Sequence, residues 1–133
     1  MAILFNKIQR LNPQNPGAEK KWYPSLKMLK RISEKEAAKQ IADETTLNRK
    51  EAEMAISQFQ KVLIANLLSG YSVQLGDWGS FYLSCNSEGS ATKEEATATK
   101  IKNLNIRFVP GKELKDALKT ASFIPVESMV SGT

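Results

Sequence analysis

The chain contains no histidine and a single cysteine among its 133 residues. Without histidine, the common zinc ligand sets and the usual acid–base catalyst are missing, and one cysteine cannot form an internal disulfide. Cys85 has no basic neighbour in the sequence that would activate it, so we expect a buried or idle thiol there and not a nucleophile. We therefore expect no catalytic residue, no metal site, no cofactor and no small-molecule substrate. An enzyme is the weakest of the function classes considered.

Long apolar runs are also missing. The apolar start Met1–Phe5 ends at Asn6, which is too short for a signal peptide, and no segment approaches the ~20 residues of a membrane span. We expect a cytoplasmic protein with no membrane partner. A chain of 133 residues with 41% hydrophobic and 25% charged residues fits one modest folded domain.

Acidic residues are scarce in the N-terminal quarter. Residues 1–31 carry seven Lys or Arg side chains against Glu19 alone, a formal charge of +6, whereas residues 32–133 sum to −1. A basic segment of this kind suits a polyanionic partner such as DNA. The alternative is an ordinary solvated, lysine-rich surface.

Turn residues predict a β-hairpin in this basic segment. The stretch Asn12–Gly17 contains two prolines and a glycine, and it separates two arms between residues 2 and 30. In the second arm Trp22, Pro24 and Leu26 alternate with polar residues, which is the pattern of a half-buried strand. Proline has no N–H to donate, so we expect an edge strand there.

Two capped helices are expected next. Ser33 followed by Glu36 is a capping box and predicts a helix to about Glu44. Asn48 begins a second, longer amphipathic helix, which ends near Gly70. The first helix has only a thin apolar face, so it needs a partner helix to be stable.

Strands dominate the remainder of the chain. Apolar residues between Val73 and Leu83 surround a glycine-containing turn and predict a hairpin. Residues 86–100 are poor in large apolar groups and are expected to form a loop or projecting arm, before a returning strand over 101–109. Gly111 then precedes a short helix, which should run to about Ala121.

Two motifs in this order resemble a known family. Val73-Gln74-Leu75-Gly76-Asp77-Trp78-Gly79-Ser80-Phe81 resembles the V-x-L-x-G-F-G-T-F signature of the HU/IHF-like, histone-like DNA-binding proteins. The segment from Phe108 to Leu118 resembles their F-x-x-G-K-x-L-K-D-x-V ending. The resemblance covers about residues 33–121, and it leaves the first 32 residues as an extension like that of a longer HU-related branch.

The resemblance implies an α+β, HU/IHF-like fold in an intertwined homodimer. It has two N-terminal helices, a three-stranded antiparallel sheet with a protruding arm and a short C-terminal helix. We expect an N-terminal basic β-hairpin extension over 1–32, the DNA-binding domain over 33–121 and a C-terminal tail over 122–133. Four aromatic residues resemble the core that the family buries between subunits: Phe59, Trp78, Phe81 and Phe108.

The function implied is nucleoid-associated, architectural binding of double-stranded DNA, largely independent of sequence. Amides at the helix N-termini near Ser33 and Gly111 favour phosphate oxygens. The basic candidates for DNA contact are Lys20, Lys21, Lys27, Lys30, Arg31, Lys35, Lys100, Lys102, Arg107, Lys112, Lys115 and Lys119. Solvated surface lysines are the alternative interpretation of this set.

The arm departs from the family pattern. HU/IHF proteins carry many Lys and Arg residues there and an R-N-P-x-T-G tip whose proline wedges between base steps. Residues 86–99 have a formal charge of −2 and no proline. A dimeric protein-interaction module with weak or lost DNA binding is therefore the competing hypothesis.

Deleting residues 87–97 should change duplex affinity by no more than a few-fold. The reason is that this arm is acidic and has no apolar wedge, so it should contribute little to the affinity for DNA. Equilibrium binding of the deletion variant to duplex DNA measures the effect. A collapse of affinity in a variant that keeps the wild-type mass in solution would show that the arm contacts DNA after all.

Overall fold

The structure is a computed structural model that describes residues 2–130 and the side chains of residues 2–128. These residues divide into two compact units. Unit 1 combines the described residues up to Ile32 with those from Leu118 onward, and unit 2 spans Ser33–Ala117. None of the helices described is both long and apolar enough to cross a membrane.

Two capped helices open unit 2. Helices α1 (Glu34–Glu44) and α2 (Arg49–Leu68) begin where the sequence predicts. The Ser33 hydroxyl accepts a hydrogen bond from the Glu36 amide at 3.2 Å, and the Asn48 side chain accepts one from the Glu51 amide at 2.8 Å. Each bond satisfies one of the amides that a helix N-terminus leaves without an intrahelical partner.

The helices pack through small side chains. Ala38 of α1 and Ala52 of α2 are both buried, and alanine allows two helix backbones to approach closely. The Ser57 hydroxyl donates to the Glu34 carboxylate at 2.8 Å, which ties the two helices together near the start of α1. Helix α1 therefore lies against a partner helix, as its thin apolar face leads us to expect.

A three-stranded antiparallel sheet follows, in the order β3 (Val73–Gln74), β4 (Gly79–Ser87), β5 (Ile101–Pro110). Directly paired residues share a face of a sheet, so the register sorts its two faces. The pairs Phe81–Phe108 and Leu83–Ile106 form an apolar face. The alternate pairs Tyr82–Arg107 and Ser84–Asn105 form a polar face.

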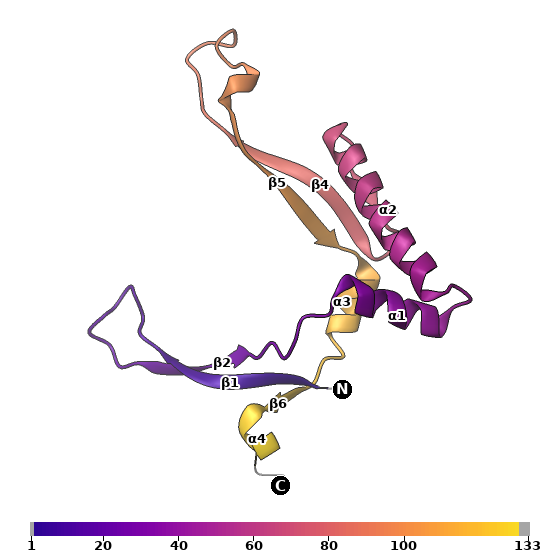
Figure 1. Ribbon diagram of the computed structural model, residues 1–133. Helices are drawn as coiled ribbons and strands as arrows, with labels where there is room; N and C mark the ends of the chain where they lie inside the picture. The colour runs from indigo at the N-terminus through magenta and orange to yellow at the C-terminus, as the bar shows by residue number, and fades with distance from the viewer. Residues whose placement is uncertain (1, 131–133) are drawn as a thin grey trace. The chain divides into compact units, whose positions relative to one another are not determined.

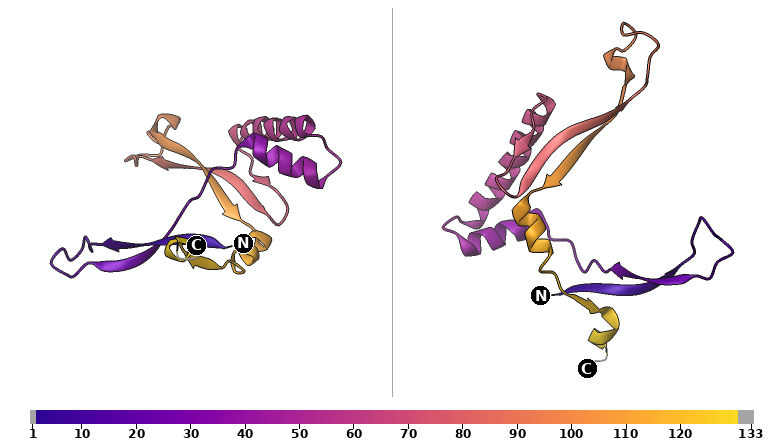
Figure 2. Two further views of the ribbon diagram at one scale, coloured as in Figure 1. Left: turned by 60° about the horizontal axis from the view of Figure 1, so that its bottom comes forward. Right: turned by 180° about the vertical axis from the view of Figure 1, so that it is seen from behind.

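The β4–β5 ribbon continues beyond the end of α2 as a projecting arm (Figures 1 and 2). Its register shifts between Ser84 and Asn86, and nearby Asn103 has a φ of 52°. Such an irregularity bends the ribbon locally. A loop and the short helix η1 (Ala98–Lys100) close the arm, which agrees with the arm expected from the sequence.

The last helix is shorter than expected. Helix α3 (Lys112–Leu118) ends three residues before Ala121, where the sequence analysis placed its end. The reason is that the following residues enter a strand, and the Ser122 carbonyl accepts a hydrogen bond from the Ile3 amide at 2.8 Å. The prediction of a helix to Ala121 is therefore wrong.

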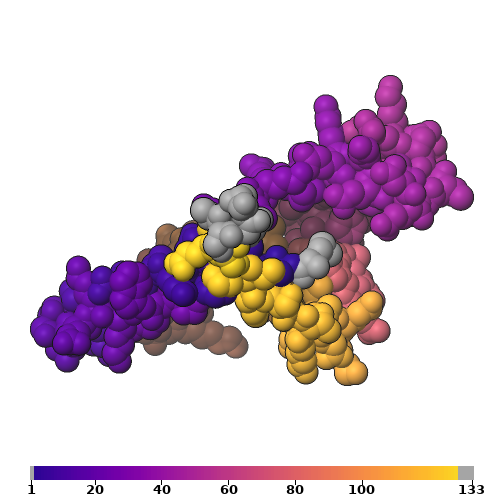
Figure 3. Space-filling model, turned by 90° about the horizontal axis from the view of Figure 1, so that it is seen from below, coloured from indigo at the N-terminus to yellow at the C-terminus, as the bar shows by residue number. Residues whose placement is uncertain are grey.

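Unit 1 is a second three-stranded sheet. Strands β1 (Ile3–Arg10) and β2 (Lys21–Leu26) form the predicted hairpin, and β6 (Phe123–Pro125) lies parallel to β1 on its other side. Helix α4 (Val126–Val130) follows. Residues assigned to a tail from the sequence thus supply the third strand, and in Figure 3 the C-terminal residues of this unit, in yellow, lie against the indigo residues of β1.

Pro24 lies in β2 at a position where the strand needs no N–H donor. The Lys27 amide donates to the Leu4 carbonyl at 2.8 Å. Amides alternate in direction along an antiparallel strand, so the amide position of Pro24 points away from β1, where no ladder bond is lost. This confirms the expected edge strand, because β2 ends the order β2-β1-β6.

Neither unit encloses a large apolar core by itself. Among residues 2–128 the buried apolar side chains are Leu4, Ala38, Ala52 and Leu67. Trp78 and Phe108 on the sheet of unit 2 are 47% and 38% exposed. A domain of this size normally covers such rings, since burial of apolar surface is the main driving force of folding.

Gly79 is the position where the sheet of unit 2 is least tolerant of a side chain. Its φ is 154°, and a Cβ atom there would lie 2.5 Å from the Val109 carbonyl oxygen and 2.6 Å from the Phe108 ring. Gly79→Ala should therefore lower the free energy of unfolding by about 2–3 kcal/mol. Chemical denaturation measures this loss.

Gly89→Ala in the arm is the matched control, because a Cβ atom there meets nothing within 4 Å. We expect it to change the free energy of unfolding by less than about 0.5 kcal/mol. Equal stability of the two variants would mean that the contact between the start of β4 and the end of β5 is misplaced.

Candidate nucleic-acid interface

The polar face of the β4–β5 sheet is the first candidate surface. Arg107 and Tyr82 lie opposite each other, and the Arg107 Nε donates to the Ser84 hydroxyl at 3.1 Å. This bond holds the guanidinium stem on the face while its other N–H groups are available to an acceptor. Arginine, tyrosine, serine and asparagine are all donors to phosphate and sugar oxygens in DNA complexes.

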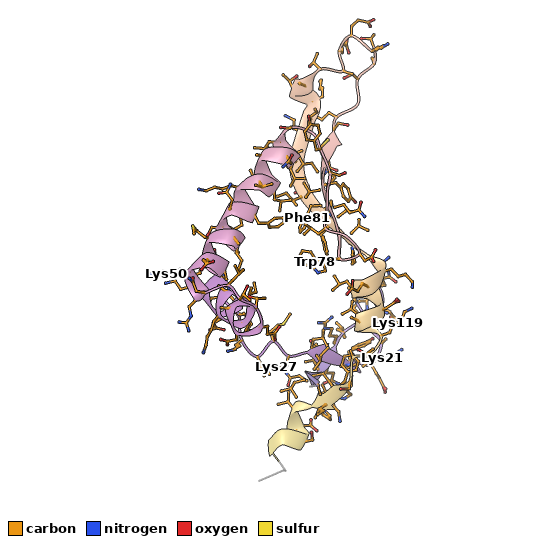
Figure 4. The ribbon with its side chains drawn as sticks, turned by 90° about the vertical axis from the view of Figure 1, so that its right-hand side faces the viewer. Lys21, Lys27, Lys50, Trp78, Phe81 and Lys119 are labelled. Carbon is orange, nitrogen blue, oxygen red and sulfur yellow. The ribbon has the colours of Figure 1, made fainter. Side chains whose placement is uncertain are left out.

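A second basic surface lies where α1 and α2 begin. Lys35, Lys39, Arg49 and Lys50 surround a shallow pocket of ≈ 410 Å³, together with Glu36 and Glu53. The excess of two positive charges favours an anion. Figure 4 shows Lys50 pointing outward from α2, away from the sheet.

The corner at the start of α3 is less favourable to an anion. Lys112 forms an ion pair with Asp116 at 3.6 Å, and both line a pocket with Asp77 and Glu113. Three carboxylates against one lysine leave this corner negative. The Gly111 amide is also engaged, since it donates to the Trp78 carbonyl at 2.7 Å.

The other candidates of unit 2 lie along the arm and α3. Lys100 ends η1 at the base of the arm loop, and Lys102 lies on β5 opposite Asn86. Lys115 lies on α3, one turn beyond Gly111. Ser33 caps α1, with Lys35 in the first turn beside Glu34 and Glu36.

The remaining basic candidates belong to unit 1. Lys20 precedes β2 and Lys21 begins it, directly opposite Arg10 of β1. The segment after β2 carries Lys27, Lys30 and Arg31, and Lys119 follows α3. Unit 1 as a whole has eight basic and two acidic side chains, a formal charge of +6, whereas unit 2 carries −1.

Three of the four aromatic residues expected in the dimer core form a cluster. The ring centroids of Phe81 and Phe108 are 4.8 Å apart, and Trp78 lies 5.6 Å from Phe108 and 6.3 Å from Phe81. In Figure 4 the Trp78 and Phe81 side chains lie on the side of the sheet that faces α2. Phe59 is half-buried on α2 and makes none of these ring contacts.

The structure adds residues that the sequence analysis missed. Tyr82, Ser84 and Asn105 join Arg107 on the polar sheet face, and Lys39, Arg49 and Lys50 join Lys35 at the helix corner. The strand residues could have been found from the two-residue period, and Lys35 and Lys39 from their four-residue spacing. Arg49 comes close to Lys35 and Lys39 only because α1 packs against α2, and the spacing of residues along the chain does not reveal this packing.

Within residues 2–130, no group of three or more His, Cys, Asp or Glu residues could hold a metal ion. Cys85 is an exposed thiol on β4. The basic and polar side chains of the surfaces above offer electrostatic attraction and hydrogen-bond donation.

A family model described as "HU domain fused to wHTH, Ig, or Glycine-rich motif" (HU-HIG) matches residues 1–125. Among solved structures, one match is a candidate bacterial DNA-binding protein from Bacteroides vulgatus, with 13% identity and a TM-score of 0.66. The alignment covers 94% of this chain and 48% of that one, so the chain spans about half the length of this relative. No curated protein matches the sequence.

A second solved match is the Anabaena HU–DNA cocrystal structure, with 18% identity and a TM-score of 0.54. It covers 67% of this chain and 99% of the Anabaena chain. At these identities the two structures establish likeness of fold, and that likeness agrees with the α+β, HU-like architecture of helices, antiparallel sheet and added N-terminal strands.

Changing Lys20, Lys21, Lys27 and Lys30 together to Gln should weaken duplex binding at low salt. Each lost phosphate contact flattens the slope of log K against log salt concentration by ~0.9, so we expect a slope shallower by roughly 2–4. Titrations at several salt concentrations measure the slope. The control changes Lys61 and Lys93 to Gln, two lysines that are not among the candidates for DNA contact, and should leave the slope within about one. If the slope of the quadruple variant is unchanged, those four lysines do not contact DNA and are ordinary solvated surface residues.

Proposed function

The chain belongs to the HU-HIG family of HU domains, and from that premise we propose that it is a nucleoid-associated, histone-like protein that binds double-stranded DNA as a homodimer. It would act in the bacterial cytoplasm as an architectural protein and not as an enzyme. The observation that carries the proposal is the two-faced β4–β5 sheet, which is apolar on one side and polar with Arg107 on the other.

The apolar side supports the dimer. Trp78 and Phe108 remain partly exposed in the single chain, and Ile106 on the same face is 53% exposed. Each Å² of such surface removed from water contributes roughly 25 cal/mol, so a partner that covers these side chains is strongly favoured. A second copy offers the same face, which suits the symmetric interfaces of homodimers.

The polar side supports a duplex partner. Its donors can contact phosphate and sugar oxygens, which are the same at every base pair and carry no sequence information directly. Two such faces in a dimer would attract a polyanion, together with the basic pocket at the starts of α1 and α2 and the +6 charge of unit 1. Binding should therefore be largely independent of DNA sequence.

A protein-interaction module on the same fold is the second candidate. The observation that favours it is the arm, where residues 86–99 have a formal charge of −2 and project into solvent. Such an arm suits a basic protein partner better than phosphates. In that case the dimer would persist and duplex DNA would not bind.

A fluorescence-anisotropy titration with random-sequence duplex DNA at several salt concentrations tests the proposal. We expect binding whose log K falls with log salt concentration with a slope of about −4 or steeper, which corresponds to roughly four or more phosphate contacts. Competition between unrelated duplexes should shift the affinity by only a few-fold. A stable, folded protein that fails to bind at low salt would favour the protein-interaction module.

A further inference from the structure

The sheet of unit 1 has an apolar face that none of its three strands covers. The register places Phe5 of β1 beside Leu26 of β2, and Ile3 of β1 beside Phe123 of β6. Alternate residues of β2 share a face, so Trp22 and Pro24 lie on the same side as Leu26. We call this face the platform and define it as Phe5, Trp22, Pro24, Leu26 and Phe123. Each strand contributes one aromatic ring to it.

The platform is open and continuous. Trp22 is 67% exposed and Phe123 is 56% exposed. Two shallow hollows run along the face, one of ≈ 340 Å³ over Phe5, Pro24, Leu26 and Phe123, and one of ≈ 320 Å³ toward Trp22. Phe5 and Pro24 line both hollows, so a single extended ligand could follow them from β6 to the far end of β2.

The charge around the platform points to a polyanion. Unit 1 carries a formal charge of +6, and Lys20, Lys21 and Lys27 lie at the two ends of β2. Lys7 lines the hollow beside Trp22 and pairs with Glu127 at 3.8 Å. A second copy of this face would bring two units of +6 together, which disfavours self-association in the absence of an anion.

An extended ligand with flat apolar groups and a phosphate backbone would match both the exposed rings of the platform and the positive charge around it. Single-stranded nucleic acids stack their bases on exposed aromatic rings while cations follow the backbone. The bases of an intact duplex are already stacked on each other, so they cannot lie on a sheet face. We propose that the platform of unit 1 binds unpaired bases of single-stranded nucleic acid, with Trp22 as the main stacking residue. The inference rests on the proposed function for its nucleic-acid partner, but it places unpaired bases on unit 1 and not on the sheet of unit 2.

The test is a titration of the full chain with fluorescein-labelled oligothymidylate, followed by anisotropy. Trp22→Ala should lower the affinity about 5- to 150-fold, which is the range of ~1–3 kcal/mol for one stacked base. Trp22→Tyr keeps a ring and should bind within a few-fold of wild type, whereas Trp22→Leu keeps an apolar side chain without a ring and should bind like Trp22→Ala. The matched control is Met28→Ala, a residue of unit 1 that is 84% exposed and lies outside the sheet, and it should bind like wild type.

Stacking also has a spectroscopic signature. Oligothymidylate should quench tryptophan emission in the wild-type chain, and the quench should be largely lost in Trp22→Tyr, whose remaining tryptophan is Trp78. Trp22 is mostly exposed, so these variants should keep the wild-type unfolding curve.

Four other results would contradict the inference, and each would point to a different explanation. If random duplex binds but oligothymidylate does not, the platform inference fails and the proposed function stands. If Trp22→Leu binds oligothymidylate as well as Trp22→Tyr does, the face contributes general apolar contact and not stacking. If the wild-type mass exceeds a dimer and Trp22→Ala restores the dimer, without binding of oligothymidylate, the platform is a contact between copies of this chain. If neither nucleic acid binds, both proposals are wrong.

Discussion

The apolar face of the β4–β5 sheet is the constraint on which the account of unit 2 depends. Phe81, Phe108 and Trp78 form a ring cluster, yet Trp78 and Phe108 remain 47% and 38% exposed. The buried side chains of the two helices are Ala38, Ala52 and Leu67. A monomer would have to leave this surface in water, against the main driving force of folding. The second copy that we propose would cover it and would leave the opposite, polar faces of both sheets for the DNA partner.

The two units differ in formal charge, which is +6 for unit 1 and −1 for unit 2. The arm of unit 2 is acidic and lacks a proline, whereas unit 1 carries the whole positive excess of the chain. In the family that the sequence resembles, the arm combines cations with an apolar wedge. Here cations and exposed rings occur together on the added sheet of unit 1. Under the two proposals, unit 2 would contact phosphates, and unit 1 would contact both phosphates and unpaired bases.

Much of the fold could be predicted from local patterns. The caps at Ser33 and Asn48 predicted both helix starts, and turns rich in proline or glycine between alternating residues indicated both hairpins, because each of these signals lies within a few neighbouring residues. Strand β6 could not be predicted, since it pairs with β1 across more than a hundred residues and consists of only Phe123–Pro125. The basic pocket around Arg49 was missed for the same reason, because helix packing creates it.

The mass of the chain in solution tests the central claim most directly, because every surface proposed for unit 2 presupposes that its apolar face is covered. Light scattering at micromolar concentration, without DNA, should give twice the 14.8 kDa of one chain. Dilution should not release monomers until the protein begins to unfold, since the dimer that we propose is intertwined and would form together with the fold. A stable, folded species of 14.8 kDa would contradict the account.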